Sequence, residues 1–214
     1  MMVIVTPIVD AVGPILRGRV LFAVPTRAPR FAVTLDDGPD PATTPAVLDV
    51  LARHGARATF FLLGERAAAH PDLVARIAAE GHELGNHTWR DEPTWRLPVD
   101  EFAAKLADTR RVLEEHGLVR WFRPGSGWPT ARHLDVTEAA GLRCALGSAV
   151  AISGAGAGTA GTARSLDAVI ARGGVLVLHE GPGRAAVPAT LDALLARTAA
   201  RGLDAVTLST LADG

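Results

Sequence analysis

Two adjacent aspartates, Asp36 and Asp37, directly follow an apolar run in this chain of 214 residues. Neighbouring carboxylates at the end of a buried strand are costly unless something positive binds them. A metal ion would let one aspartate serve as a ligand while the other stays free as a base. The alternative is an ordinary turn, because Gly38 and Pro39 follow and both Asp-Gly and Gly-Pro are common turn sequences.

A second pair of candidate metal ligands is formed by His87 and Asp91, which are four residues apart. One helical turn would place both side chains on the same face, where they could hold one ion. Taken alone, such a pair is more often a surface hydrogen bond. Together with Asp37 it would give an oxygen, nitrogen and oxygen ligand set with open positions, which suits Zn²⁺, Co²⁺, Mn²⁺ or Fe²⁺ without choosing among them.

Two further polar residues stand where apolar runs end. Arg123 follows Trp121 and Phe122, and His179 follows the run Val175–Leu178. The carboxyl ends of parallel strands meet at one edge of a sheet or barrel, and active sites are built there. The sequence therefore predicts that the acids, the imidazoles and this guanidinium share a single rim.

The elements that would position these residues are short apolar strands alternating with helices. This alternation predicts parallel strands joined by helical crossovers. Seven or so units suggest a closed or nearly closed α/β barrel, with an open doubly wound sheet as the alternative. The predicted strands are 31–35, 57–63, 82–85, 120–122, 143–147, 175–178 and 204–207, and the predicted helices are 43–54, 71–80, 100–116, 133–140, 165–172 and 189–201.

The domain organisation follows from the same pattern. Residues 1–29 are expected to be an N-terminal segment that packs on the domain, and residues 30–214 are expected to form a single catalytic domain. The segment 149–163 lacks charge and is rich in glycine, so we expect a surface loop there.

Composition limits the classes of partner. The net charge is −1 and no long run of like charges occurs, so no nucleic-acid partner is expected. The uncharged N-terminal stretch 1–9 is too short to span a bilayer and lacks a convincing secretion signal, so the expectation is no membrane partner and a cytoplasmic protein.

Cys144 is the only cysteine and is expected to be a small buried side chain. The oligomeric state stays open.

Four segments in combination resemble the polysaccharide deacetylase family, also called carbohydrate esterase family 4 or the nodulation-type deacetylase domain. The resemblance covers about residues 30 to 211 and implies a distorted (β/α) barrel with about seven parallel strands. The segments that carry it are Thr34–Pro39, Gly81–Thr88, Arg123–Ser126 and Leu176–His179.

The resemblance also implies a role for each residue of the predicted rim. Asp36 would be the general base, and His179 would be the acid that protonates the leaving amine. Asp37 and His87 would be metal ligands, and Arg123 would orient the base. The implied cofactor is one divalent ion, with zinc placed first and cobalt, manganese, iron or nickel as alternatives.

The chain departs from the usual family pattern at three places. Asp91 stands where the family usually has a second ligand histidine. This chain is similar to a branch of the family that reads His-Thr-x-x-Asp-Glu-Pro and then Arg-Pro-Gly-Ser-Gly. The similarity implies that Asp91 is the third ligand. Ser126 replaces a frequent aromatic, and Gly125, Ser126 and Trp128 are the expected substrate-binding residues. No aspartate follows Leu146 to tune the acid histidine.

The expected activity is removal of an N-acetyl or other N-acyl group from an amino sugar or a carbohydrate-like molecule. The expected partner is accordingly an N-acetylated sugar or a related small molecule. Two alternatives stay open: a metal-assisted reaction on a small natural product or peptide, and a non-catalytic binding protein that retains the fold.

Overall fold

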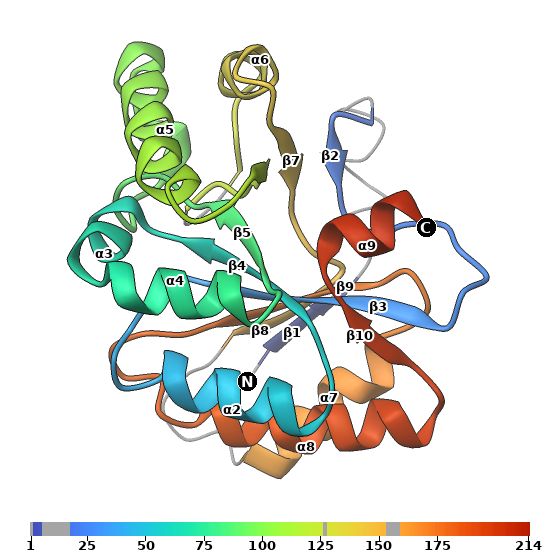
Figure 1. Cartoon of the computed structure of the whole chain (residues 1–214). Coiled ribbons are helices and arrows are strands. Elements are labelled where there is room, and N and C mark those ends of the chain that lie inside the picture. The colour runs from blue at the N-terminus through green and yellow to red at the C-terminus, as the bar shows by residue number, and fades with distance from the viewer. Residues whose placement is uncertain (1, 6–17, 126–127, 153–158) are drawn as a thin grey trace.

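The computed structural model describes residues 2–5, 18–125, 128–152 and 159–214, which form a single α/β domain (Figure 1). Its strands are β1 (Met2–Val5), β2 (Val20–Leu21), β3 (Arg30–Asp36), β4 (Ala58–Leu62), β5 (Glu83–Asn86), β6 (Val119–Phe122), β7 (Arg143–Ala145), β8 (Ala149–Ile152), β9 (Val175–His179) and β10 (Asp204–Val206). Its helices are α2 (Thr44–Arg53), α3 (Gly64–Ala69), α4 (Pro71–Ala79), the 3₁₀ turn η1 (Thr94–Arg96), α5 (Val99–Glu114), α6 (Ala131–Ala139), α7 (Thr159–Val169), α8 (Val187–Ala200) and α9 (Leu208–Asp213).

The strands form one curved sheet, which confirms the predicted parallel α/β architecture. Parallel pairing runs through β8, β9, β3, β4, β5, β6, β7 and β2 in that order. β1 extends one end by antiparallel pairing with β8, and β10 pairs with β3 in parallel. Among the described strands, β1 and β2 end the order without pairing with each other, so the barrel is incomplete.

The centre of the sheet is apolar because helices cover it. Every residue of β4 is buried, and so are the six residues of β3 that follow Arg30. Figure 1 shows α2, α7 and α8 packed together below β3, while α5 and α6 lie at the top beside the rising strands β5 to β7. Both faces of β3 and β4 are nevertheless covered, because Ala32 and Phe61 pack in a second apolar cluster with Leu208 and Leu211 of α9. Burial on both faces explains why these strands read as continuous apolar runs instead of alternating patterns.

The structure differs from the sequence-based expectation in several elements. The segment 149–163 is not one loop, because its start is β8 and α7 begins at Thr159; residues 153–158 lie outside the described part. The pairing of β8 with β1 and β9 depends on distant residues, so local composition could not indicate it. The helix expected from Asp100 begins at Val99, after Pro98. The N-terminal segment 1–29 contributes β1 and β2 to the sheet.

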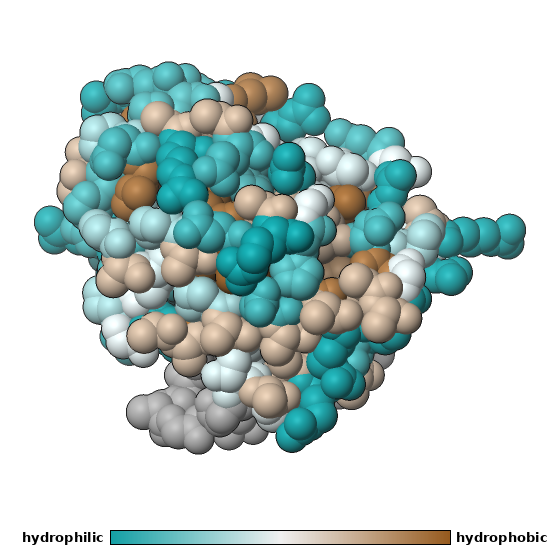
Figure 2. Space-filling view, turned by 60° about the horizontal axis from the view of Figure 1, so that its bottom comes forward, coloured by the Kyte–Doolittle hydropathy of each residue, from teal (hydrophilic) through white to brown (hydrophobic). Residues whose placement is uncertain are grey.

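The face of the molecule seen in Figure 2 is mixed in polarity. With the bottom of Figure 1 turned forward, hydrophilic residues alternate with paler ones and brown hydrophobic residues occur in small spots (Figure 2). In the described part of the chain, no helix is long and apolar enough to cross a membrane. Cys144 is buried, as expected, and burial raises the pKa of its thiol to about 12. Among the residues that the structure describes, the exposed large hydrophobic side chains are Trp95, Leu118 and Trp128.

Candidate active site

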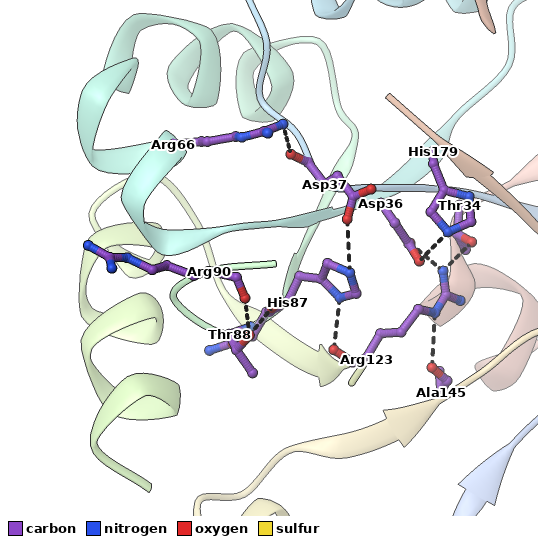
Figure 3. A network of polar contacts seen from close by, with 11 residues as sticks. Thr34, Asp36, Asp37, Arg66, His87, Thr88, Arg90, Arg123, Ala145 and His179 are labelled. Atoms are coloured by element: carbon purple, nitrogen blue, oxygen red, sulfur yellow. Dashed lines mark hydrogen bonds and ion pairs between the residues drawn. The ribbon is translucent and has the colours of Figure 1, made fainter. Parts of the chain in front are cut away.

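The carboxyl ends of β3, β5, β6 and β9 bring the predicted residues together at one rim (Figure 3). Asp36 is the last residue of β3, and His179 is the last residue of the neighbouring β9. His87 and Arg123 each directly follow a strand, β5 and β6 respectively. Asp37 follows β3. The parallel register therefore produces the cluster that the strand-end argument predicted.

Asp37 and His87 face each other. An Asp37 Oδ1 oxygen lies 3.3 Å from His87 Nε2. The other ring nitrogen of His87, Nδ1, lies 2.9 Å from the carbonyl oxygen of Arg123. With Nδ1 donating to that carbonyl, Nε2 faces the Asp37 carboxylate and can carry either a proton or, when deprotonated, a metal ion. This is how a metal-ligating histidine is usually oriented by its second hydrogen bond.

The ionisation of this pair also fits a cation site. Burial would raise the pKa of the Asp37 carboxyl, but the hydrogen bond with His87 and the charges of His87 and His179 outweigh it and lower the pKa. Burial would likewise lower the pKa of His87, but the Asp37 hydrogen bond and the nearby aspartate charges raise it. Both shifts favour a negative carboxylate beside a positive group, and a bound cation would serve as that positive group once His87 is deprotonated, as a ligand must be.

Asp36 is fixed by a buried ion pair. Arg123 donates from Nη1 to Asp36 Oδ1 over 2.6 Å, and both side chains are 3% exposed. The same nitrogen contacts the Thr34 hydroxyl oxygen at 2.6 Å, and that hydroxyl donates to the carbonyl of Leu176. The second Asp36 oxygen, Oδ2, faces His179. Asp36 is therefore held by one oxygen and presents the other to the rim.

Arg123 is rigidly held by contacts on several sides. Its Nε donates to the carbonyl of Ala145 over 3.0 Å, and its Nη2 donates to the carbonyl of Leu146 over 2.9 Å. The guanidinium carbon lies 4.1 Å from the ring centroid of Phe61. A guanidinium with this many partners orients Asp36 well, which fits the predicted role of Arg123.

His179 is the more accessible member of the cluster. Its Nε2 lies 4.0 Å from Asp36 Oδ2, and its side chain is 26% exposed. A substrate atom can therefore approach the imidazole, next to which lies the free carboxylate oxygen of Asp36. This separation suits a base and an acid that act on different atoms of one substrate.

The structure does not support the helical turn that was expected to join His87 to Asp91. Residues 87–93 form a bent loop, and Thr88 has a φ of 66°, so no helical turn joins His87 to Asp91. Among the described residues, His, Cys, Asp and Glu side chains form no group of three that could hold a metal. The argument from helical spacing was therefore wrong, while the role of Asp91 as third ligand stays a prediction.

The expected substrate-binding residues lie on the loop after β6. Ser126 falls outside the described residues. Gly125 is buried, and its carbonyl accepts a hydrogen bond from the Thr94 amide over 3.2 Å. A side chain at Gly125 would meet the Glu92 carbonyl at 2.7 Å, so a glycine lets the two loops touch. Trp128 is 40% exposed beside the ring of Phe22, and its contact with a substrate stays a prediction.

Three further residues around the aspartates were not given a role from the sequence. Thr34 supports Arg123, Arg66 contacts the backbone of Asp37, and Glu180 is buried behind Gly38. The only sign in the sequence that Glu180 lies near the site is its position directly after His179. The other two act through contacts between residues far apart in the chain.

Comparison with known proteins bears on the same region. The model of the family described as polysaccharide deacetylase matches residues 23–145. A peptidoglycan-N-acetylglucosamine deacetylase of Bacillus cereus is 35% identical over 127 residues, which cover 55% of this chain and 46% of the relative. The match thus spans less than half the length of that relative.

Solved structures agree over nearly the whole fold. A peptidoglycan N-acetylglucosamine deacetylase in complex with a substituted benzamide has a TM-score of 0.88 at 28% identity, with 93% of this chain and 95% of that chain covered. A family 4 acetyl xylan esterase from Clostridium thermocellum in complex with a cobalt ion has a TM-score of 0.78 at 28% identity, with 85% and 89% covered. The matched family model and the shared fold lead to one conclusion: this chain belongs to the polysaccharide deacetylase family.

Proposed function

We propose that this protein is a metal-dependent deacetylase that removes an N-acetyl group from an amino sugar. The observation that carries the proposal is that one rim combines two groups of side chains. The Asp36 carboxylate is buried and held by Arg123, and the Asp37 carboxylate faces the ring of His87. Deacetylase relatives that act on N-acetylated sugars support the substrate class. Zinc is our first choice of metal, and cobalt, manganese, iron and nickel are alternatives that oxygen and nitrogen ligands also accept.

Asp37 and His87 would hold the ion, with Asp91 as the proposed third ligand. A bound divalent ion would supply Lewis-acid chemistry, polarising the amide carbonyl and acidifying water. The lowered pKa of the Asp37 carboxyl keeps this side chain anionic, as a ligand must be. The hydrogen bond between His87 and the Arg123 carbonyl keeps the ring aimed at the same point.

The other rim residues would divide the proton transfers between them. Asp36 takes a proton from the attacking water through Oδ2, because Arg123 occupies Oδ1. A carbon–oxygen bond forms and the carbon–nitrogen bond breaks. His179 donates a proton to the departing nitrogen, so the products are acetate and a free amino sugar. Trp128 would supply an aromatic surface against a sugar ring.

The test measures metal content and acetate release on the same preparation. Purified protein is stripped with chelator, reloaded with one equivalent of zinc or cobalt and incubated with N-acetylglucosamine oligomers. The proposal expects acetate release only after reloading, and it expects Asp37→Ala to lose both the metal and the activity. Stoichiometric metal with no acetate from any N-acetylated sugar would instead favour a different amide substrate or a binding protein.

A further inference from the structure

The junction between β4 and α3 contacts the loop that follows His87. The Gly64 amide donates to the Thr88 carbonyl over 2.9 Å, and the Glu65 amide donates to the Trp89 carbonyl over 3.0 Å. A side chain at Gly64 would lie 2.4 Å from the Trp89 ring, so the two segments are in direct contact. The first turn of α3 therefore fixes the backbone next to His87.

The same junction contacts the turn that carries Asp37. The Leu63 amide donates to the Gly38 carbonyl over 2.9 Å. Two residues into α3, Arg66 donates from Nη1 to the carbonyl of Asp37 over 2.7 Å, as Figure 3 shows. One short segment, residues 63–66, thus touches the backbones on both sides of the Asp37–His87 pair.

The backbone around Arg66 is shaped to admit its guanidinium. Gly181, just past the end of β9, has a φ of 115°, and a side chain there would lie 2.5 Å from Arg66 Nη1. Asp37 has a φ of 73°, a left-handed conformation that residues other than glycine seldom adopt, although aspartate tolerates it better than most. A conformation that is disfavoured alone persists only where surrounding contacts hold it.

We propose that Arg66 is a positioning residue that fixes the Asp37 carboxylate opposite His87. Arg66 holds the Asp37 carbonyl in the left-handed turn, while its own helix is tied to the loop after His87. The distance between the two proposed ligands is then set through α3 rather than by either strand alone. This inference rests on the proposed metal site, and it assigns Arg66 no contact with substrate.

The test is a titration of metal-free protein with Co²⁺ alone, followed by visible absorption and without any sugar. Arg66→Met removes the hydrogen bond while keeping an apolar stem. Arg53→Met is the matched control, because it removes the same charge from the exposed side of α2, where Arg53 pairs with Asp192. Thermal unfolding of each metal-free variant is recorded alongside.

We expect Arg66→Met to weaken Co²⁺ binding by about tenfold or more, the value of one hydrogen bond that involves a charged group. The visible absorption spectrum of the Co²⁺-loaded Arg66→Met variant should also change, because the ligand geometry changes. The Arg53→Met variant should match wild type in Co²⁺ affinity and in its spectrum. If Arg66→Met does not fold, Arg66→Gln takes its place with the same expectation. An affinity within about twofold of wild type would overturn the inference.

The outcome is separable from that of the proposed function. If wild-type protein binds no Co²⁺, the metal site itself is wrong. If wild type binds Co²⁺ and releases acetate while the Arg66 variants bind equally well, only the role of Arg66 is refuted.

Discussion

The buried carboxyl of Glu180 should make the stability of this protein fall as the pH rises. Its Oε2 accepts a hydrogen bond from the Thr44 hydroxyl over 2.9 Å, but its Oε1 has no hydrogen-bond partner among the described residues. Burial, together with the negative charges of Asp40 and Asp37, raises the pKa of Glu180 to about 8, against an ordinary value of 4.5. The folded state therefore favours the protonated carboxyl.

The sign and size of the effect follow from that pKa. Because the folded pKa lies above the unfolded one, the unfolded state loses its proton first, and the folded state is penalised as the pH rises from the ordinary value towards the raised one. Each pH unit in this window costs about 1.4 kcal/mol. Between pH 5 and pH 7 the wild type should therefore lose about 3 kcal/mol relative to a variant with a neutral side chain at this position.

Glu180→Gln supplies that variant, because glutamine has nearly the same shape and stays neutral. Urea unfolding of chelator-treated protein at several pH values gives the free energy of unfolding for both proteins. Glu115→Gln is the matched control, since Glu115 is exposed at the end of α5. We expect the wild-type and Glu180→Gln curves to diverge with rising pH, and curves that run parallel throughout would refute the reasoning.

Three further predictions concern residues around the rim. Gly38→Ala should destabilise the fold by about 1–3 kcal/mol in urea unfolding, because a Cβ there would lie 1.9 Å from Glu180 Oε1; unchanged stability would contradict the packing. Arg123→Lys should lower kcat by roughly 100-fold or more while metal content is kept, since lysine cannot reproduce the fork that holds Asp36 and two carbonyls; acetate release at the wild-type rate would argue against an orienting role. Trp128→Ala should raise KM about two- to tenfold with little change in kcat, the range expected for one aromatic contact; an unchanged KM would remove Trp128 from the substrate site.

The main part of the site could be predicted because its residues follow recognisable strands. Asp36, Arg123 and His179 each end an apolar run, and parallel strands place such ends side by side. The continuous apolar character of β3, β4 and β9 indicated that both faces of the sheet are covered. The cluster at the rim therefore required no knowledge of distant contacts.

The parts that could not be predicted depend on backbone conformation and on distant contacts. Thr88 adopts a left-handed conformation that a β-branched residue rarely takes, so nothing in the local residue types indicated that helical spacing fails after His87. Helix α3 has only six residues and is rich in alanine, which leaves no periodic apolar pattern to detect. The contact of Arg66 with the Asp37 backbone was hidden for the same reason.

The most direct test of the account compares acetate release by wild type and Asp36→Asn, each reloaded with the same metal and assayed on the same N-acetylated sugar. Asp36 is placed as the base, so the asparagine variant should keep its metal and lose activity by at least about 100-fold, the usual contribution of a positioned base. Metal content measured on both samples excludes loss of the ion as the cause. Acetate release by metal-loaded Asp36→Asn at the wild-type rate would contradict the account.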